Sequence, residues 1–147
     1  MNRVVKFRGK RVDNGEWVYG DLYRHDPPLQ CVVPENYIPE QTKNYILKTA
    51  FADWNMPRQV EYIEVIPETI GQYTGMKDKN GKDIYEDDVV RAWSQGTMAT
   101  GKVERRVDGL WIMFPAYQNK QFWGLCPNHC GETSVEVIGN IHEGVTE

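Results

Sequence analysis

The sequence predicts a mostly β fold built from short antiparallel hairpins. Runs rich in Val, Ile, Tyr and Trp alternate with glycine-containing turn dipeptides, which is the pattern of an all-β domain. Apolar residues at helical spacing are almost absent. With 147 residues, of which 40% are hydrophobic and 12% aromatic, the chain can build the core of one domain. We therefore expect a single domain over residues 1–147.

The first hairpin is expected in the segment 1–23, which contains VVKFRGKRVDNGEWVYGDLY. Asn-Gly favours a two-residue turn because both central residues of that turn need a positive φ. A turn at Asn14 and Gly15 would place Phe7 directly opposite Leu22, an apolar cross-strand pair.

The next segment, 24–67, is predicted to be a long irregular excursion. It contains five of the eight prolines, at positions 27, 28, 34, 39 and 57. Its aromatic residues indicate that it packs in part on the β core. Within it, the stretch EQTKNYILKTAFADW (40–54) is where a short helix is expected.

A second hairpin is expected in TGMKDKNGKDIYEDD, residues 74–88. A two-residue turn there would oppose like charges across the strands. A three-residue loop at 79–81, with Gly81 left-handed, opposes Asp78 to Lys82 instead. Because attractive cross-strand pairs are favoured over repulsive ones, the charges predict the three-residue loop.

The third hairpin is expected in GKVERRVDGLWIMFP, residues 101–115, with a two-residue turn at Asp108 and Gly109. This register collects five apolar residues on one face: Val103, Val107, Leu110, Ile112 and Phe114.

The C-terminal half, residues 68–147, is predicted to form a small barrel. From residue 84 onwards the strand-like runs IYEDDVVRAW, GKVERRV, GLWIMFP and EVIGNI follow one another. Short strands in such succession are compatible with an SH3-like or OB-like barrel.

The polar segment 74–88 also invites comparison with ligand-binding loops. A phosphate-binding P-loop is excluded by spacing, because five residues separate Gly75 from Gly81 and an aspartate follows Lys82. A calcium loop would need a carboxylate at its first position, where Met76 stands. The hairpin explains the same residues without an ion, and no cofactor is expected.

Cys126, His129 and Cys130 are the best metal-ligating residues in the chain. Two thiolates and an imidazole could supply three ligands of a tetrahedral zinc site. The C-x3-C spacing is unusual for zinc, however, and a turn at Pro127 and Asn128 explains these residues equally well. Neither this cluster nor the acidic run 86–88 builds a recognisable catalytic site, so we expect no enzyme.

A binding surface is the remaining possibility. Arginine and tryptophan are enriched at binding hot spots, and basic residues interleaved with aromatic ones can also stack on single-stranded nucleic acid. The alternative is that the tryptophans belong to the core. The predicted surface residues are Arg91, Trp93, Arg105, Arg106 and Trp111.

Charge and hydropathy favour a cytoplasmic protein that binds other proteins. The net charge of −4 disfavours binding to nucleic acid through bulk charge. The N-terminus, MNRVVKFRGK, has no apolar segment typical of a secretion signal, and no run of about 18 apolar residues suggests a membrane span.

Three blocks of the sequence resemble the YopX family. They are VKFRGKRVDNGEWVYGDLY, ETIGQYTGMKDKNGKDIYEDDVV and EVIGNIHE, within residues 4–23, 68–90 and 135–143. The resemblance implies an origin in a bacteriophage or prophage and a mostly β fold, but no activity and no catalytic residue. The family pattern is similar to IYEGDIV, so Asp87 stands where glycine is usual. If that position needs a positive φ, aspartate is among the few tolerable replacements.

Together these observations predict a non-enzymatic binding module that contacts a protein, either a host factor or a second copy of itself. A single-stranded nucleic-acid-binding module of SH3-like or OB-like type is one alternative. A zinc-stabilised protein or an uncharacterised enzyme is the other.

Overall fold

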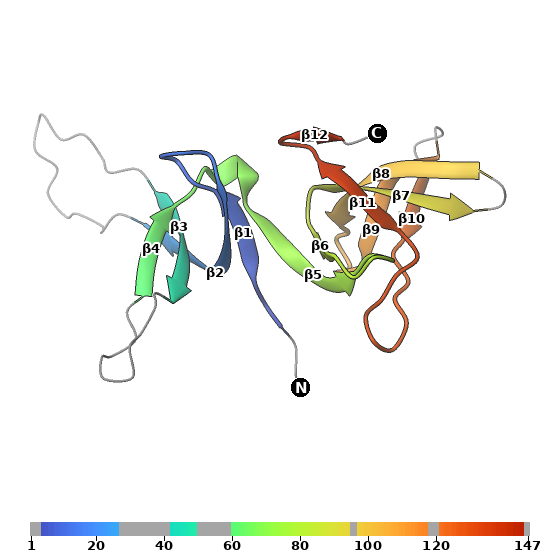
Figure 1. Cartoon of the computed structure of the whole chain (residues 1–147), viewed down its shortest axis with the longest axis horizontal. Helices are drawn as coiled ribbons and strands as arrows, with labels where there is room; N and C mark the ends of the chain where they lie inside the picture. The colour runs from blue at the N-terminus through green and yellow to red at the C-terminus, as the bar shows by residue number, and fades with distance from the viewer. Residues whose placement is uncertain (1–3, 27–41, 50–59, 95–96, 118–120, 146–147) are drawn as a thin grey trace, which may run out of the picture. The chain divides into compact units, whose positions relative to one another are not determined.

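The computed structural model describes residues 4–26, 42–49, 60–94, 97–117 and 121–145, and these are mostly β-strands (Figure 1). The mostly β prediction is therefore confirmed. By its internal contacts the chain divides into two compact units, Lys6–Ile70 and Gly71–Glu147 with Met1–Val5. Each unit is described by itself below.

The N-terminal unit contains a four-stranded antiparallel arrangement in the order β4-β3-β2-β1 (Figure 1). A short 3-10 helix, η1 (Pro67–Thr69), follows the last of these strands. The strands are β1 (Phe7–Lys10), β2 (Trp17–His25), β3 (Lys43–Thr49) and β4 (Val60–Glu64).

One face of this sheet forms the core of the unit. Alternate residues of a strand point to opposite faces, so the apolar residues of one parity gather on one side. Val18, Ile46 and Val65 are buried at the centre. The partly buried residues packed against them are Phe7, Leu22, Ile63 and Ile70.

The first hairpin differs from the predicted register by two residues. Phe7 lies opposite Gly20, not opposite Leu22. A shift of two positions keeps every side chain on its face, because side chains alternate with a period of two. Phe7 and Leu22 therefore still contact the same apolar cluster.

The shift arises because the loop has four residues, 12–15. The backbone N–H of Arg11 donates to the carbonyl oxygen of Glu16 (2.9 Å), which closes the loop. The Asn14 side chain accepts the N–H of Glu16 (2.9 Å), and Gly15 has a φ of 73°. Asn14 does not have the positive φ that a two-residue turn would require.

The prediction of an irregular excursion with a short helix is wrong where the structure can test it. Residues 43–49 of the expected helix form β3, which pairs with both β2 and β4. Ile46 is fully buried between these neighbours, while Tyr45 and Leu47 alternate to the other face. The rest of 40–54 lies outside the described residues.

The C-terminal unit contains the sheet β10-β9-β8-β7-β11-β12 and the hairpin β5-β6 (Figure 1). Its strands are β5 (Gly71–Lys77), β6 (Asp83–Tyr85), β7 (Asp88–Ser94), β8 (Thr97–Arg105), β9 (Trp111–Tyr117), β10 (Gln121–Gly124), β11 (Glu136–Asn140) and β12 (Gly144–Val145).

The expected barrel is not closed within the described residues. The sheet begins at β10 and ends at β12, and these two strands do not pair with each other. β12 has two residues, so its pairing with β11 is short. An open, curved sheet around one core replaces the SH3-like or OB-like barrel that the succession of strands predicted.

The core of the C-terminal unit is the larger of the two. Its residues come from β5 to β9 and from the segments on either side of the 126–132 turn. Its buried members are Met76, Ile84, Val90, Ala92, Ala99, Val103, Trp111, Met113, Leu125 and Val135.

The second hairpin has the predicted three-residue loop. Lys77 pairs with Asp83, and the backbone N–H of Asp78 donates to the carbonyl oxygen of Lys82 (2.8 Å). Gly81 has a φ of 83°. The register chosen from the cross-strand charges is confirmed.

The third hairpin is one residue away from its predicted register. Val103 lies opposite Met113, and the backbone N–H of Arg106 donates to the carbonyl oxygen of Leu110 (2.8 Å), which leaves a three-residue loop at 107–109. A shift of one residue moves each side chain of a strand to the other face. Trp111 therefore joins the core, and the predicted apolar face, which included Leu110, is not formed.

No helix in the described part of the chain is long and apolar enough to cross a membrane.

Candidate functional site

The five predicted surface residues fall into two separate groups. Arg91 and Trp93 lie on the same face of β7, and Trp93 is opposite Met98 of β8. Arg105, at the far end of β8, lies opposite Trp111. Met98 and Arg105 are seven positions apart, roughly 23 Å along an extended strand. The predicted set therefore does not form one surface.

Trp93 is an exposed residue, contrary to the core alternative. Its side chain is 65% exposed, and Met98 directly opposite is 50% exposed. Cross-strand neighbours on one face have Cβ atoms about 5 Å apart, so the two side chains form one apolar patch. Below, this patch and Arg91 are called the Trp93 surface.

A group of charges lies beside the apolar patch. Arg91 donates from Nη2 to Oε2 of Glu136 (2.9 Å), its neighbour on β11. Lys79 Nζ lies 3.5 Å from the same carboxylate oxygen. The hydrogen bond from Arg91 is the largest cause that lowers the pKa of Glu136, with Lys79 acting in the same direction. These contacts fix the Arg91 side chain at the border of the patch.

Trp111, by contrast, belongs to the core. It is 9% exposed and is part of the apolar cluster of the C-terminal unit. The guanidinium of Arg105 lies 5.9 Å from the Trp111 ring centroid, and Arg106 lies 3.3 Å from the carboxylate of Asp108. Burial removes Trp111 from the predicted binding surface, whereas Arg105 and Arg106 remain exposed.

Asp78 shows what the polar segment 74–88 does in the folded chain. Its side chain is 2% exposed. Oδ1 accepts the backbone N–H groups of Asn80 (2.9 Å) and Lys82 (2.8 Å), and Oδ2 accepts that of Val137 (3.1 Å). The carboxylate thus organises the loop and joins it to β11. Its role is therefore larger than the cross-strand charge pair with Lys82 that the sequence predicted.

The acidic run 86–88 forms the tight turn between β6 and β7. Asp88 is 2% exposed and accepts the N–H of Tyr85 (2.8 Å), so this residue of the acidic run is buried and not solvated. Burial is the main cause that raises the pKa of the half-buried Glu86. Asp87 has a φ of 70°, and its carboxylate lies 3.5 Å from Nε2 of His142.

Cys126, His129 and Cys130 lie on an exposed turn. The Asn128 side chain accepts the backbone N–H groups of Cys130 (2.9 Å) and Glu132 (3.0 Å), as expected of a turn at this asparagine. Within the described residues no three side chains of His, Cys, Asp or Glu are grouped to hold a metal ion. Cys31, the third cysteine of the sequence, lies outside those residues.

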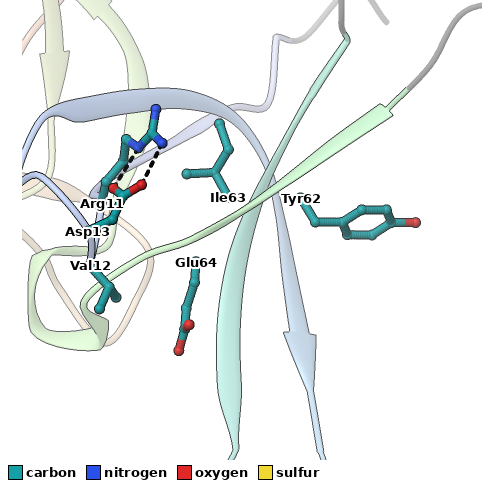
Figure 2. Close-up of a pocket in the computed structure, with 6 residues that line it drawn as sticks. All are labelled: Arg11, Val12, Asp13, Tyr62, Ile63 and Glu64. Carbon is teal, nitrogen blue, oxygen red and sulfur yellow. Dashed lines mark hydrogen bonds and ion pairs between the residues drawn. The ribbon is translucent and has the colours of Figure 1, made fainter.

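Each unit contains a pocket that is lined by described residues. The larger, of about 280 Å³, lies between the first loop and β4 and is shown in Figure 2. Its charged residues Arg11 and Asp13 bind each other through two hydrogen bonds (2.9 and 2.7 Å). The smaller, of about 50 Å³, lies beside Leu125 and Cys126.

A set of tyrosines on the N-terminal sheet was missed by the sequence analysis. Tyr23, Tyr45 and Tyr62 lie on neighbouring strands of one face, with ring centroids 6.2–6.4 Å apart. The alternation of Tyr19, Asp21 and Tyr23 was a signal for such a face. The contributions of β3 and β4 are obscured in the sequence, because the prolines of 24–67 are typical of an irregular segment.

The fold and surface define a small all-β protein with exposed aromatic residues. The family described as YopX protein matches residues 6–145. The chain belongs to the YopX family. A solved structure described as the crystal structure of protein EF1440 from Enterococcus faecalis is similar to it, with 21% identity over 97% of this chain and 96% of that chain and a TM-score of 0.39. No curated protein matches the chain.

Proposed function

We propose that the chain is a phage-derived, non-enzymatic binding module that acts in the cytoplasm of a bacterial host. In this proposal the Trp93 surface contacts a protein, either a host factor or a second copy of the chain. The observation that carries the proposal is the exposure of Trp93 beside the exposed Met98 on two regular strands.

Tryptophan in such a position favours a protein contact. Large apolar side chains are mostly buried, and an exposed apolar patch on a sheet costs solubility unless something covers it. Tryptophan is enriched among residues that cost about 2 kcal/mol or more when truncated at an interface. The Arg91–Glu136 pair beside the patch supplies the polar rim that interfaces of this type require.

The nucleic-acid alternative receives less support from the same contacts. Arg91 and Arg106 each bind a carboxylate, at 2.9 and 3.3 Å. Arginines that serve phosphate contacts need their charge available to the phosphate backbone. The Arg105 side chain lies about 20 Å away along β8, so the basic residues do not form one track.

Comparative affinity purification tests the proposal. Tagged wild-type chain and Trp93→Ala are expressed in phage-infected cells, and each captured protein is then purified and titrated against both chains. We expect one protein whose affinity falls at least tenfold for Trp93→Ala, since a hot-spot tryptophan contributes about 2 kcal/mol or more.

Tyr19→Ala is the matched control, because Tyr19 is also an exposed aromatic residue (49%) but lies in the other unit. It should bind as the wild type does. If self-association is the function, sedimentation will show an oligomer that Trp93→Ala disperses. Equal binding by wild type and Trp93→Ala, or capture of single-stranded nucleic acid alone, would contradict the proposal.

A further inference from the structure

The N-terminal unit carries a second aromatic surface, formed by Tyr23 of β2, Tyr45 of β3 and Tyr62 of β4. The centroid distances are 6.2 Å for Tyr23–Tyr45, 6.3 Å for Tyr23–Tyr62 and 6.4 Å for Tyr45–Tyr62. Both pairs that include Tyr62 are edge to face. The rings thus form a nearly equilateral group, called the tyrosine cluster below.

Strand register explains why these rings meet. Tyr23 lies opposite Tyr45, and Tyr62 lies opposite Leu47 on the same face. The intervening residues face the core on the other side of the sheet. Figure 2 shows this alternation on β4, where Tyr62 and Glu64 project to one side and Ile63 to the other.

The tyrosine cluster does not complete a core. Tyr62 is 65% exposed and Tyr23 is 42% exposed. The Tyr23 hydroxyl lies 3.3 Å from Nδ1 of His25, which holds that ring in place at the end of β2. An exposed and partly fixed aromatic group presents its electron-rich ring faces to a ligand.

Two acidic residues and one lysine surround the cluster on this face. Glu64 lies directly opposite Tyr45, and Asp21 lies opposite Leu47, which neighbours Tyr62. Lys43, at the other end of the cluster, lies opposite His25. Ring faces and carboxylates both attract cations, so the two features select the same kind of ligand.

On the same face, the ring of Trp17 already contacts two cationic side chains of the chain itself. The Arg8 guanidinium lies 4.6 Å and the Lys10 ammonium 5.5 Å from the ring centroid of Trp17. Among the described residues, no cation of the chain takes the equivalent place over the tyrosine cluster.

We propose that the tyrosine cluster, with Glu64 and Asp21, binds a lysine or arginine side chain of a basic, extended protein segment. The ring faces hold the cationic group, and the two carboxylates attract its charge. A nucleic acid is disfavoured because those carboxylates would repel its phosphates. This surface lies in the other unit from the Trp93 surface, and the inference does not depend on the function proposed for Trp93.

Fluorescence anisotropy with defined probes tests the inference on the full chain. The probe is a labelled glycine-serine peptide with interspersed lysines, compared with the same peptide carrying norleucine, an uncharged side chain of similar length. We expect saturable binding of the lysine peptide that weakens with added salt, and much weaker binding of the norleucine peptide.

Variants of exposed residues locate the binding. Tyr62→Leu should weaken the lysine peptide about two- to five-fold, the range for one exposed cation–π contact, and Glu64→Gln should weaken it further at low salt. Tyr62→Phe keeps the ring and should bind as the wild type does. Tyr19→Leu, on the same face but outside the cluster, is the matched control.

Three results would overturn the inference. The first is equal binding of the lysine and norleucine peptides. The second is competition by oligothymidylate that depends on Tyr62, which would assign the surface to nucleic acid. The third is an absence of saturable lysine-peptide binding below about 1 mM, since weaker contacts are non-specific. Circular dichroism confirms that each variant is folded.

Discussion

Asp87 occupies a backbone conformation that the family pattern fills with glycine. Its φ of 70° confirms the conditional expectation drawn from IYEDDVV. A left-handed residue other than glycine costs about 1–2 kcal/mol, less for aspartate, whose side chain can bind locally. The Asp87 carboxylate lies 3.5 Å from His142, and this contact offsets part of the cost.

Asp87→Gly should therefore be as stable as the wild type or more stable by up to about 1 kcal/mol, because glycine removes the backbone strain. Asp87→Ala keeps the strain and loses the carboxylate, so it should be the least stable of the three. Urea unfolding of all three chains measures the order. If Asp87→Gly is less stable than the wild type, the His142 contact outweighs the strain, and if it is less stable than Asp87→Ala, the strain argument is refuted.

The neighbouring Glu86 should make stability depend on pH. Burial, and then the Asp87 carboxylate, raise the pKa of Glu86. The folded chain therefore holds this proton more tightly than the unfolded chain does, and the ionised carboxylate lowers stability at neutral pH. This penalty is relieved as the pH falls through the raised pKa and is absent below the ordinary value of 4.5.

We expect Glu86→Gln to be more stable than the wild type near pH 7, with the difference shrinking towards zero at about pH 4. Denaturant unfolding at both pH values measures this. Glu16→Gln, which removes an exposed charge in the first hairpin, controls for the change in net charge. Equal stability of Glu86→Gln and wild type at pH 7 would refute the burial argument.

At the scale of elements, the hairpins show what short-range rules can predict. The charges of the second hairpin distinguish its two possible registers. A two-residue turn would place like charges opposite each other, whereas the three-residue loop places opposite charges there. The third hairpin forms the same three-residue loop, but its flanking residues Arg106, Val107 and Leu110 offer no such discrimination. The Asp-Gly dipeptide alone therefore predicted the turn but not its length.

The loop of the second hairpin also makes more hydrogen bonds to its aspartate than the loop of the third hairpin does. Asp78, which precedes its loop, is buried and accepts three backbone N–H groups, while Asp108, the aspartate within the third loop, is exposed and accepts one, from Leu110 (3.2 Å). We expect Asp78→Ala to lower the free energy of unfolding by about 2–4 kcal/mol, because it removes the buried acceptor of three backbone N–H groups.

Asp108→Ala is the matched control and should cost less than about 1 kcal/mol, since water can replace an acceptor in an exposed turn. Thermal and denaturant unfolding of both variants give the comparison. Similar losses for the two variants would mean that the burial and the additional hydrogen bonds of Asp78 add nothing to its contribution to stability.

The candidate site was predictable only in part, because the positions of its residues depend on how the strands pair. The burial of Trp111 follows from a register of the third hairpin that the Asp-Gly dipeptide could not define, and the exposure of Trp93 follows from the pairing of β7 with β8. The tyrosine cluster needs three strands whose order and pairing are non-local. Alternation in β2 was visible, but nothing in the sequence near Tyr45 or Tyr62 identified their neighbours.

At the scale of the whole molecule, the two units differ in the size of their cores. Among the described residues, three are buried at the centre of the N-terminal unit, Val18, Ile46 and Val65, against ten in the C-terminal unit. The mostly β class and the family followed from composition and sequence blocks, because these average over many residues. The division into two units did not, because it depends on long-range contacts.

This difference predicts unequal protection against hydrogen exchange. The slowest amides should lie in the central strands β8 and β9, with those of β3 and β4 exchanging faster, because local opening is easiest where little apolar surface is buried. Native-state exchange followed by NMR or mass spectrometry measures this. Val103→Ala should accelerate exchange in β7 to β9 more than in β3. Slower exchange in β3 than in β8 would contradict the prediction.

The bond from Val137 to the carboxylate of Asp78 has a consequence for biosynthesis. The two residues are 59 positions apart, so the ribosome releases the aspartate long before its last hydrogen-bond donor. A nascent chain can form the hairpin, but one carboxylate oxygen must stay hydrated until the final strands emerge. A nonsense mutation between residues 86 and 137 would thus leave the second hairpin without this hydrogen bond, although every residue of the hairpin had been made.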